Sequence, residues 1–532
     1  MIPIRIQKYI LIPASVLSGA AGALAMPGYG FWPLLCLSLS CLYIIIYCES
    51  SKTRAFFSGW AFGFGYHLVG LSWIGNALLI EGNPFRWAYP LALTGPPLIL
   101  GLYTALGAWA VKYRNLRTWQ GFLFFVCVFA LIDWLRGHLF TGFPWNLYAY
   151  SWAGQAEIIQ SVSVFGIYGL NLLTIAFFSF PGRIAVNIIN GSQKARSAEL
   201  WVTSASICVL IITVYIFGSY RLQSHPVQSS HDTYVVVVQP NIAQSDKWHP
   251  DKLKENFLAH NRLTQKAASD NKKYQRSYVI WPESALNPVL LNSQVVSELL
   301  QETLSKYPGS SYLISGALRR NKTGNDVEHY NSIIVMNENG EIKSVYNKHH
   351  LVPFGEYIPL SKIIDIAPIV GFSGFIEGQT PESILLEKES RSFIPLICYE
   401  AIFPWISRKA ALRKYNSNNE LSMIINVTND AWYGPTAGPV QHFHQTRFRA
   451  IESGLPVIRS ANTGISAIID PYGRVIKKQA FNTSGTLKAD LPLKTGGTIY
   501  HQFGDLPFLL LSVLAALVSL ILAKVQYKKP RL

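Results

Sequence analysis

The stretch SFIPLICYEAIFP, Ser392–Pro404, joins an apolar run to a thiol and an acid at the point where a buried strand should end. The first half has the short apolar character of a buried strand. Cys398 and Glu400 follow at its end. Because ligands and catalytic groups collect at strand ends in α/β sheets, Cys398 has two interpretations, a packed core cysteine or a reactive thiol.

The composition indicates a membrane protein that carries one soluble domain. Of 532 residues, 50% are hydrophobic and 14% charged, whereas roughly a quarter of the residues are charged in soluble domains. Long apolar runs crowd residues 9–220 and return at 507–523. The formal charge of +16 does not indicate nucleic-acid binding, because many of the basic residues punctuate the apolar runs instead of forming one patch.

The apolar runs predict a polytopic helical membrane domain, since a spanning helix needs about 20 mostly apolar residues. About eight spans are expected, at roughly 9–26, 31–47, 56–80, 88–111, 119–135, 159–181, 200–219 and 506–523. Lys and Arg gather in alternate connections and at the C-terminus, which places both termini in the cytoplasm. We therefore expect a membrane domain at 1–220 with about seven spans, an exported domain at 221–500, and a last span with a basic tail at 501–532.

Two features of the membrane part each allow two interpretations. The first apolar run follows Arg5 and Lys8 and contains Ala23–Ala25, so it fits a cleavable signal peptide or a retained span, of which we favour the second. The connection 136–158 is rich in aromatic rings suited to the level of the lipid headgroups. It fits an aromatic belt or a substrate portal, and Trp145 is therefore a candidate substrate-binding residue.

The segment 221–500 predicts an α/β layered sandwich, because apolar strands alternate with helices and hairpins. Strands are expected at 233–241, 277–284 and 311–318 and in the runs around 392–400 and 421–430, helices near 250–268 and 292–306, and hairpin turns at Asn337–Gly340 and Asp470–Gly473. Cys398 is the one cysteine of this segment, so the segment can form no internal disulfide. In an oxidising compartment a lone thiol is a liability, which favours a functional role.

Three strand ends carry polar residues in compact motifs: Glu283 in WPES, Lys348 in NKHH and Cys398 in ICYE. Each alone has an ordinary explanation, as a neighbour of a helix N-cap, a solvated loop charge and a core cysteine. Together they supply a base, a cation and a nucleophile, the groups needed for acyl transfer through a thioester.

Four motifs carry a resemblance to the nitrilase superfamily: WPESAL, YNKHHLVPFGEYIPL, ICYEAIF and NVTNDAWYGPTAGPVQHFHQTRFRAIESGLPVIRSANTG. With QPNIAQSDKW and the multispan part, the chain is similar over nearly its whole length to the bacterial apolipoprotein N-acyltransferase family. The resemblance implies a nitrilase-like α-β-β-α sandwich exported from a polytopic membrane domain.

The resemblance also implies roles for particular residues. Glu283 would be the proton acceptor, Lys348 the oxyanion stabiliser and Cys398 the nucleophile. Supporting or substrate-binding roles are implied for Glu356, Tyr399, Glu400, Trp248 and Asn331. The resemblance implies no metal and no dissociable cofactor. We interpret His349 and His350 as loop histidines and not as a metal pair, because no third ligand is evident.

The implied reaction is a ping-pong transfer of a fatty acyl chain from a phospholipid, through a cysteine thioester, to the N-terminal amino group of the diacylglyceryl-cysteine of an apolipoprotein. The implied place is the bacterial inner (plasma) membrane, with a periplasmic catalytic domain, and we expect a monomer. One alternative is a membrane-anchored amidase or hydrolase, in which water replaces the amine. The other is a transporter or receptor, which the scarcity of ionisable residues inside the spans, with Asp133 and His67 the nearest candidates, disfavours.

Overall fold

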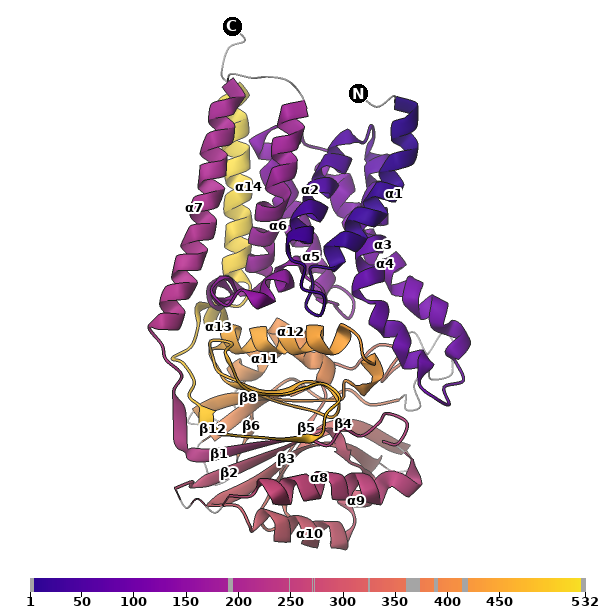
Figure 1. The fold of residues 1–532 in the computed structure, drawn as a ribbon, viewed down its shortest axis with the longest axis vertical. Helices are drawn as coiled ribbons and strands as arrows, with labels where there is room; N and C mark the ends of the chain where they lie inside the picture. The colour runs from indigo at the N-terminus through magenta and orange to yellow at the C-terminus, as the bar shows by residue number, and fades with distance from the viewer. Residues whose placement is uncertain are drawn as a thin grey trace. The chain divides into compact units, whose positions relative to one another are not determined.

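The computed structural model describes residues 4–189, 195–247, 249–269, 271, 273–323, 326–359, 374–386, 391–413 and 420–527. The chain divides into two compact units (Figure 1). The first comprises Met1–Gly75, Ala88–Ser224 and Gln502–Leu532, and the second comprises Asn76–Trp87 and His225–His501. Both ends of the chain therefore belong to the first unit, and the central segment forms most of the second.

The first unit is a bundle of helices. Its long helices are α1 (Ile4–Ala23), α2 (Pro33–Cys48), α3 (Lys52–Gly70), α4 (Tyr89–Val111), α5 (Trp119–His138), α6 (Val162–Ile189), α7 (Ala195–Gln223) and α14 (Leu506–Tyr527). Each corresponds to one expected apolar run. The third run is shorter than expected, because α3 ends at Gly70 and a 3-10 helix, η1 (Ser72–Leu79), follows it.

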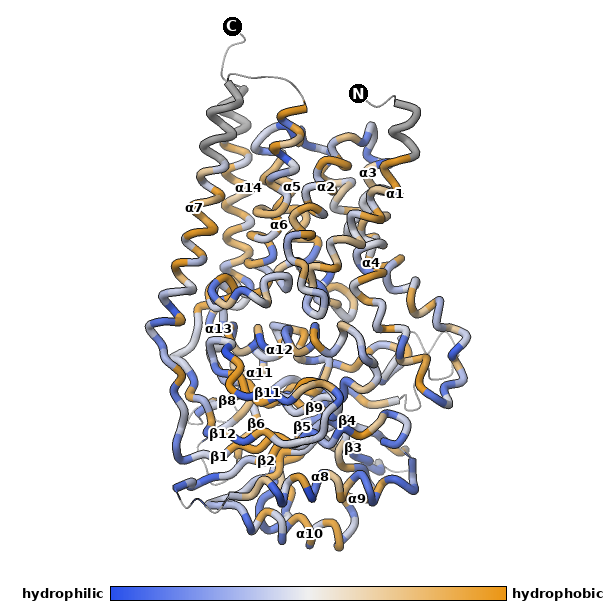
Figure 2. The backbone as a smooth tube through the Cα atoms, in the orientation of Figure 1, coloured by the Kyte–Doolittle hydropathy of each residue, from blue (hydrophilic) through white to orange (hydrophobic). Residues whose placement is uncertain are grey.

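The helices of this unit have the apolar character of a membrane domain. Within the described part of the chain, four segments are long and apolar enough to cross a membrane: Arg86–Val111, Trp119–His138, Ile158–Ile189 and Ser204–Gln223. Three shorter apolar helices are Ile10–Ala23, Pro33–Cys48 and Leu506–Ile521. Figure 2 shows the apolar residues running along α7 and α14. Length and composition therefore support a membrane domain, without establishing the expected number of eight spans.

Small residues allow α3 and α4 to approach each other closely. A Cβ placed on Gly59 would lie 2.4 Å from the Cβ of Ala108, and one placed on Gly63 would lie 2.8 Å from the Cα of Gly101. Glycine at these positions permits backbone contact, which is how helices commonly associate in lipid, where the hydrophobic effect gives no attraction between them.

The aromatic side chains of the connection after α5 lie inside the first unit. Trp145, Tyr148, Tyr150 and Trp152 are all buried. The ring of Trp145 lies 4.6 Å from that of Trp73. Since a belt of rings at the headgroup level would be exposed on the protein surface, the aromatic-belt interpretation is wrong for these four residues.

Asp133, an ionisable residue inside a predicted span, has partners within the first unit. Its carboxylate lies 3.0 Å from Arg136 and accepts a hydrogen bond of 2.8 Å from the amide of Asn171. Paired and hydrogen-bonded in this way, the carboxylate fits a structural role in the bundle better than a transport path.

The second unit contains two sheets, each with six strands among the described residues. The first has the order β12-β1-β2-β3-β4-β5 and the second β11-β10-β9-β8-β7-β6. The strands of the first sheet are β1 (Ser229–Gln239), β2 (Arg276–Leu286), β3 (Ser310–Thr323), β4 (Asp326–Asn337), β5 (Ile342–Asn347) and β12 (Gly485–Pro492). Those of the second are β6 (Ile384–Leu385), β7 (Arg391–Ile397), β8 (Glu420–Thr428), β9 (Val457–Ala461), β10 (Ser466–Ile469) and β11 (Val475–Gln479). The runs β1-β2-β3 and β7-β8-β9 are parallel.

Helices cover the outer faces of both sheets, as Figure 1 shows. The first sheet carries α8 (Leu253–Ala267), α9 (Pro288–Leu291) and α10 (Gln294–Leu304), and the second carries α11 (Pro404–Leu412) and α12 (Gly438–Ser453). Alternate residues of β1 face the two layers: Val235 and Val237 enter the core between the sheets, and Val236 and Val238 enter the core under the helices. Burial on both faces explains the unbroken apolar run, and the expected α-β-β-α layering is confirmed.

The two expected hairpin turns are present. The N–H of Gly340 donates to the carbonyl of Asn337 at 3.0 Å between β4 and β5. The N–H of Gly473 donates to the carbonyl of Asp470 at 2.9 Å between β10 and β11. Both glycines have φ of +75°, a conformation that favours glycine because it has no Cβ.

Candidate active site

Cys398 is the first residue after β7 and lies in a sharp turn. Its φ is +49°, and a 3-10 helix, η6 (Cys398–Ile402), begins there. A left-handed conformation costs a residue with a side chain about 1–2 kcal/mol, and such strain collects at functional sites. The residue is 3% exposed and belongs to the core between the sheets. A plain core cysteine would not need this backbone, so the turn favours a functional role.

Glu283 lies near the end of β2 and connects the two sheets. One carboxylate oxygen accepts a hydrogen bond of 2.8 Å from the amide of Asn331, and the other accepts one of 2.8 Å from the backbone N–H of Asn429. Asn331 is on β4, whereas Asn429 follows β8 of the other sheet. The next residue, Ser284, has φ of +53°, so this strand also turns at the site.

Lys348 follows β5, and its ammonium is buried between carboxylates. The Nζ atom lies 2.8 Å from Oε2 and 2.9 Å from Oε1 of Glu356, and 3.9 Å from Oε1 of Glu283. Burial alone would lower the pKa of Lys348, but Glu356 and Glu283 raise it above its usual value. The lysine therefore stays protonated, as a buried charge can when it is paired.

Asn331 and Glu356 belong to the same network. The Nδ2 atom of Asn331 donates to both Glu283 and Glu356 at 2.8 Å, and its backbone carbonyl accepts a bond of 2.8 Å from the N–H of Lys348. Glu356 also accepts a bond of 2.8 Å from the backbone N–H of Val352, which fixes its own loop. The structure thus brings two of the supporting residues into direct contact with Glu283 and Lys348.

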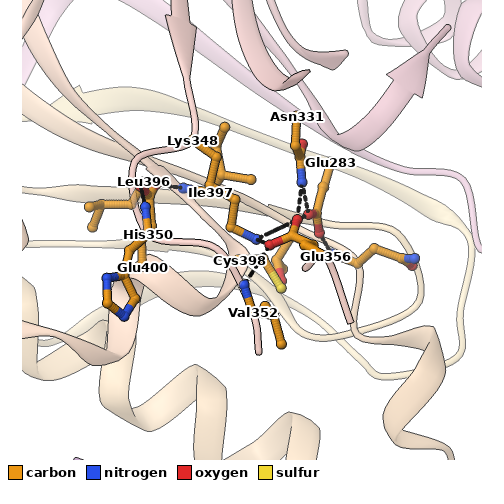
Figure 3. A network of polar contacts seen from close by, with 12 residues as sticks. Glu283, Asn331, Lys348, His350, Val352, Glu356, Leu396, Ile397, Cys398 and Glu400 are labelled. Atoms are coloured by element: carbon orange, nitrogen blue, oxygen red, sulfur yellow. Dashed lines mark hydrogen bonds and ion pairs between the residues drawn. The ribbon is translucent and has the colours of Figure 1, made fainter. Parts of the chain in front are cut away.

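The sulfur of Cys398 lies beside this group of charges in Figure 3. Burial raises the pKa of the thiol, Glu283 raises it further, and Lys348 lowers it. The resting sulfur is therefore protonated, and reaction requires a group that accepts its proton. The site supplies a carboxylate for that purpose in Glu283 and an ammonium that can stabilise a developing oxyanion in Lys348.

Glu400 is buried and binds backbone groups on two sides of the site. One oxygen accepts bonds of 2.8 Å from the hydroxyl of Tyr346 and from the N–H of His349, and the other accepts a bond of 2.7 Å from the N–H of Ile397. The carboxylate therefore joins the loop after Lys348 to the strand end before Cys398. The contact of Glu400 with the neighbourhood of Lys348 is therefore a hydrogen bond to the backbone of that loop.

Of the three remaining predicted residues, the structure describes Tyr399 and Trp145 but not Trp248. Tyr399 packs in an aromatic cluster, with its ring 5.0 Å from Phe403 and 5.8 Å from His350. Trp145 belongs to the first unit, whereas Cys398 belongs to the second. Trp248 lies outside the described residues. Among the residues that are described, no group of three or more His, Cys, Asp or Glu could hold a metal ion.

Two features near the site were not predicted. Lys247 is buried and donates a hydrogen bond of 2.8 Å to the backbone carbonyl of Glu283, and burial lowers its pKa to about 8. A buried cluster of Asp430, His442 and Arg459 lies behind Cys398. All four residues fall inside the quoted motifs, but a polar or charged residue in a sequence motif gives no sign that folding will bury it.

Two family models match this chain, one over the N-terminal helical region and one over the α/β region that follows it. The model of the apolipoprotein N-acyltransferase N-terminal domain matches residues 18–180, and the carbon-nitrogen hydrolase model matches residues 235–500. The apolipoprotein N-acyltransferase of Rhodopseudomonas palustris is 35% identical over 521 residues, which cover 95% of this chain and 94% of that one. The chain belongs to the apolipoprotein N-acyltransferase family.

Other apolipoprotein N-acyltransferases match over both parts as well. That of Brucella melitensis is 35% identical over 529 residues, covering 96% of this chain and 95% of its own, and that of Rickettsia bellii is 37% identical over 497 residues, covering 92% and 93%. A solved carbon-nitrogen hydrolase of Helicobacter pylori aligns with 49% of this chain and 89% of its own at 17% identity, with a TM-score of 0.33. Membership of the family makes the chain an acyltransferase with a nitrilase-like α/β unit.

Proposed function

We propose that this apolipoprotein N-acyltransferase moves a fatty acyl chain from a phospholipid, through a thioester on Cys398, to the amino group of the diacylglyceryl-cysteine at the N-terminus of an apolipoprotein. One observation carries the proposal: Glu283, Lys348 and Cys398 lie in one network although they come from the ends of different strands. The family supports the acceptor, since the relatives matched over nearly their whole length are named apolipoprotein N-acyltransferases.

In the first half of the reaction, Glu283 accepts the thiol proton of Cys398 as the sulfur attacks the ester carbonyl of the phospholipid. Lys348 stabilises the oxyanion together with the backbone N–H of Tyr399. The intermediate then expels the lysophospholipid alkoxide, which takes the proton from Glu283. The acyl chain is left on the sulfur, and the carboxylate of Glu283 is restored.

In the second half, the amine of the apolipoprotein attacks the thioester carbonyl. Glu283 accepts the proton that the amine loses, and the same two donors stabilise the oxyanion. Collapse forms the amide and releases the thiolate of Cys398, which Glu283 reprotonates. The cycle needs no metal and no dissociable cofactor, because the thioester itself stores the activated acyl group.

The size of the acyl chain explains why such an enzyme carries membrane helices. Transfer of a chain from water to lipid is favourable by about 0.8 kcal/mol per CH₂, which amounts to roughly 12 kcal/mol for a sixteen-carbon chain. The thioester therefore has to form where the chain stays in lipid or in an apolar groove. We propose that the catalytic unit lies on the periplasmic side of the inner membrane, that both termini lie in the cytoplasm, and that the enzyme is a monomer.

Cysteine labelling tests this topology. In intact cells, a membrane-impermeant maleimide should label Lys273→Cys, which lies on the second unit, and should label Lys52→Cys only after the membrane is made permeable. The opposite result at either position would reject the proposed orientation.

Mass spectrometry of the intact protein tests the chemistry. After exposure to phospholipid, the wild type should gain the mass of one acyl chain, and the control Cys208→Ser should gain it too. Cys398→Ser should gain none, because an alcohol is much less acidic and nucleophilic than a thiol. Lys348→Ala should form the adduct about 10²–10³ times more slowly, as expected for loss of an oxyanion donor. An acyl adduct on the serine variant would reject Cys398 as the carrier.

A chase of the acyl-enzyme separates the transferase from the alternative hydrolase. A lipopeptide with a free N-terminal amine should discharge the thioester and yield the amide, while buffer alone should leave the thioester in place. Release of free fatty acid in buffer, at the rate seen with the peptide, would instead identify a hydrolase.

A further inference from the structure

The backbone carbonyl of Cys398 has a side-chain partner on α12. The Nε2 atom of His442 lies 3.0 Å from this oxygen. Because a carbonyl oxygen can only accept, Nε2 must carry a proton and donate it to this bond. The histidine is completely buried, so no water competes for the carbonyl from that side. The peptide group between Cys398 and Tyr399 is therefore held by a hydrogen bond from the imidazole of His442.

Buried charged groups hold His442 in turn. Its Nδ1 atom lies 3.0 Å from one oxygen of Asp430, and the other oxygen lies 2.7 Å from the guanidinium of Arg459. The hydroxyl of Thr428 donates a bond of 2.9 Å to the first oxygen, and Arg459 donates one of 3.0 Å to the hydroxyl of Thr446. Burial alone would raise the pKa of Asp430, but Arg459 and His442 lower it below its usual value, so the carboxylate stays ionised.

A cluster of this kind is a poor source of stability. Removing an aspartate and an arginine from water costs several kcal/mol per ion, and a well-packed apolar replacement is often as stable or more so. Its contact with the backbone of Cys398 suggests that the cluster serves the site.

The geometry of the peptide group connects His442 to the oxyanion. The carbonyl of Cys398 and the N–H of Tyr399 belong to one planar peptide group, which is trans. In a trans peptide the C=O and the N–H point in opposite directions, so a bond that fixes the carbonyl also fixes the direction of the N–H. A hydrogen bond to the carbonyl also polarises the group and makes its N–H a stronger donor.

We propose that His442, held by Asp430 and Arg459, is a positioning residue that aims the N–H of Tyr399 at the oxyanion by holding the carbonyl of Cys398. The inference rests on the proposed function, in which Cys398 carries the acyl group. It predicts that substitution of His442 lowers the rate of reactions of Cys398 that pass through an oxyanion. Reactions of Cys398 that form no oxyanion should keep their rate.

Two reactions of the same thiol separate this role from a general structural one. Acylation by a phospholipid passes through a tetrahedral oxyanion. Alkylation by iodoacetamide is a direct displacement at carbon and forms no oxyanion. Both rates are followed on the full-length enzyme, by the mass of the peptide that contains Cys398.

The side chain of His442 allows a matched pair of variants. His442→Asn places an amide near the position of Nδ1, where it can bond to Asp430, and loses the donor to the carbonyl of Cys398. His442→Gln places a donor near the position of Nε2. His444→Leu, on the same helix, is the control, since it removes a largely buried imidazole that has no hydrogen bond to Cys398.

We expect His442→Asn to slow acylation by up to about 10²-fold, the effect of losing one oxyanion donor, while alkylation stays near the wild-type rate. His442→Gln should recover most of the acylation rate, and His444→Leu should change neither reaction. Thr446→Val removes one acceptor from Arg459 and should lower acylation selectively by a smaller factor, which keeps the test open if His442→Asn does not fold.

An equal loss of both reactions in His442→Asn, or a loss of neither, would overturn the inference. Equal loss would mean that His442 places the sulfur itself. Absence of a thioester in the wild type would overturn the proposed function, an outcome that does not depend on any variant of His442.

Discussion

The ammonium of Lys348 lies between the two carboxylate oxygens of Glu356, at 2.8 and 2.9 Å. The nearest oxygen of Glu283 is more distant, at 3.9 Å. The closer pair offsets most of the charge on the lysine, and in the proposed mechanism this leaves Glu283 available for the proton of Cys398. Glu356, for which the resemblance implies a supporting role, contacts both the ammonium of Lys348 and the backbone N–H of Val352 in its own loop.

Glu356→Gln should therefore affect both stability and acylation. Removing one partner of a buried ion pair costs about 3–5 kcal/mol, because the other charge stays buried. Lys348 should then move toward Glu283 and occupy the proton acceptor, which slows thioester formation. Thermal unfolding and the rate of acyl adduct formation measure the two effects. Glu377→Gln, an exposed carboxylate 3.4 Å from His349, is the control; an equal effect of the two substitutions would contradict the assignment.

Glu283→Gln should separate the acidity of the thiol from its use in catalysis. The charge of Glu283 raises the pKa of Cys398, so its removal should lower that pKa and shift the pH profile of iodoacetamide alkylation toward lower pH. Thioester formation should nevertheless fall by about 10²–10⁴-fold, because the proton acceptor is lost. A profile that stays in place or moves to higher pH would contradict the electrostatic argument.

Cys398 should also contribute to the alkaline sensitivity of the fold. Its pKa in the folded chain is raised above the usual 9.0. Above pH 9 the thiol of an unfolded chain releases its proton, while the thiol of the folded chain retains it. The contribution of Cys398 to the free energy of unfolding is therefore fully present below the unfolded pKa and is lost as the pH rises toward the folded pKa. The stability difference between the wild type and Cys398→Ala should therefore shift against the wild type above about pH 9. Thermal unfolding midpoints across this range provide the measurement.

Glu400→Gln should weaken the hydrogen bonds that hold the loop after Lys348 and the strand end before Cys398. The amide nitrogen of glutamine takes the place of one carboxylate oxygen and cannot accept the hydrogen bonds donated to that oxygen, either those from Tyr346 and His349 or that from Ile397. An unsatisfied buried donor costs about 1–3 kcal/mol, and the loss of the negative charge weakens the bonds that remain. The unfolding temperature and the rate of acylation should both fall. Tyr346→Phe removes only one donor and should have a smaller effect on each; an effect as large as that of Glu400→Gln would contradict the role of the backbone contacts.

The outline of the fold could be predicted because its signals are local. The apolar run of β1, the Asn337–Gly340 turn and the apolar helices each follow from a short stretch of sequence. The candidate catalytic residues were found in the same way, because each stands in a compact motif at a strand end. Trp145 shows the limit of such local signals, because the sequence around an aromatic residue does not tell whether folding exposes or buries its side chain. In the structure Trp145 is completely buried.

The sequence by itself determined the two-part composition, the strand ends that carry Glu283, Lys348 and Cys398, and the family. Only the tertiary structure decided which groups meet: Glu283 contacts Asn429, 146 positions away, and the carbonyl of Cys398 is held by His442 from a helix that follows another strand. The physical reason is that a periodic pattern specifies which face of a segment is buried, whereas hydrogen bonds between buried polar groups depend on the packing of segments that are distant along the chain.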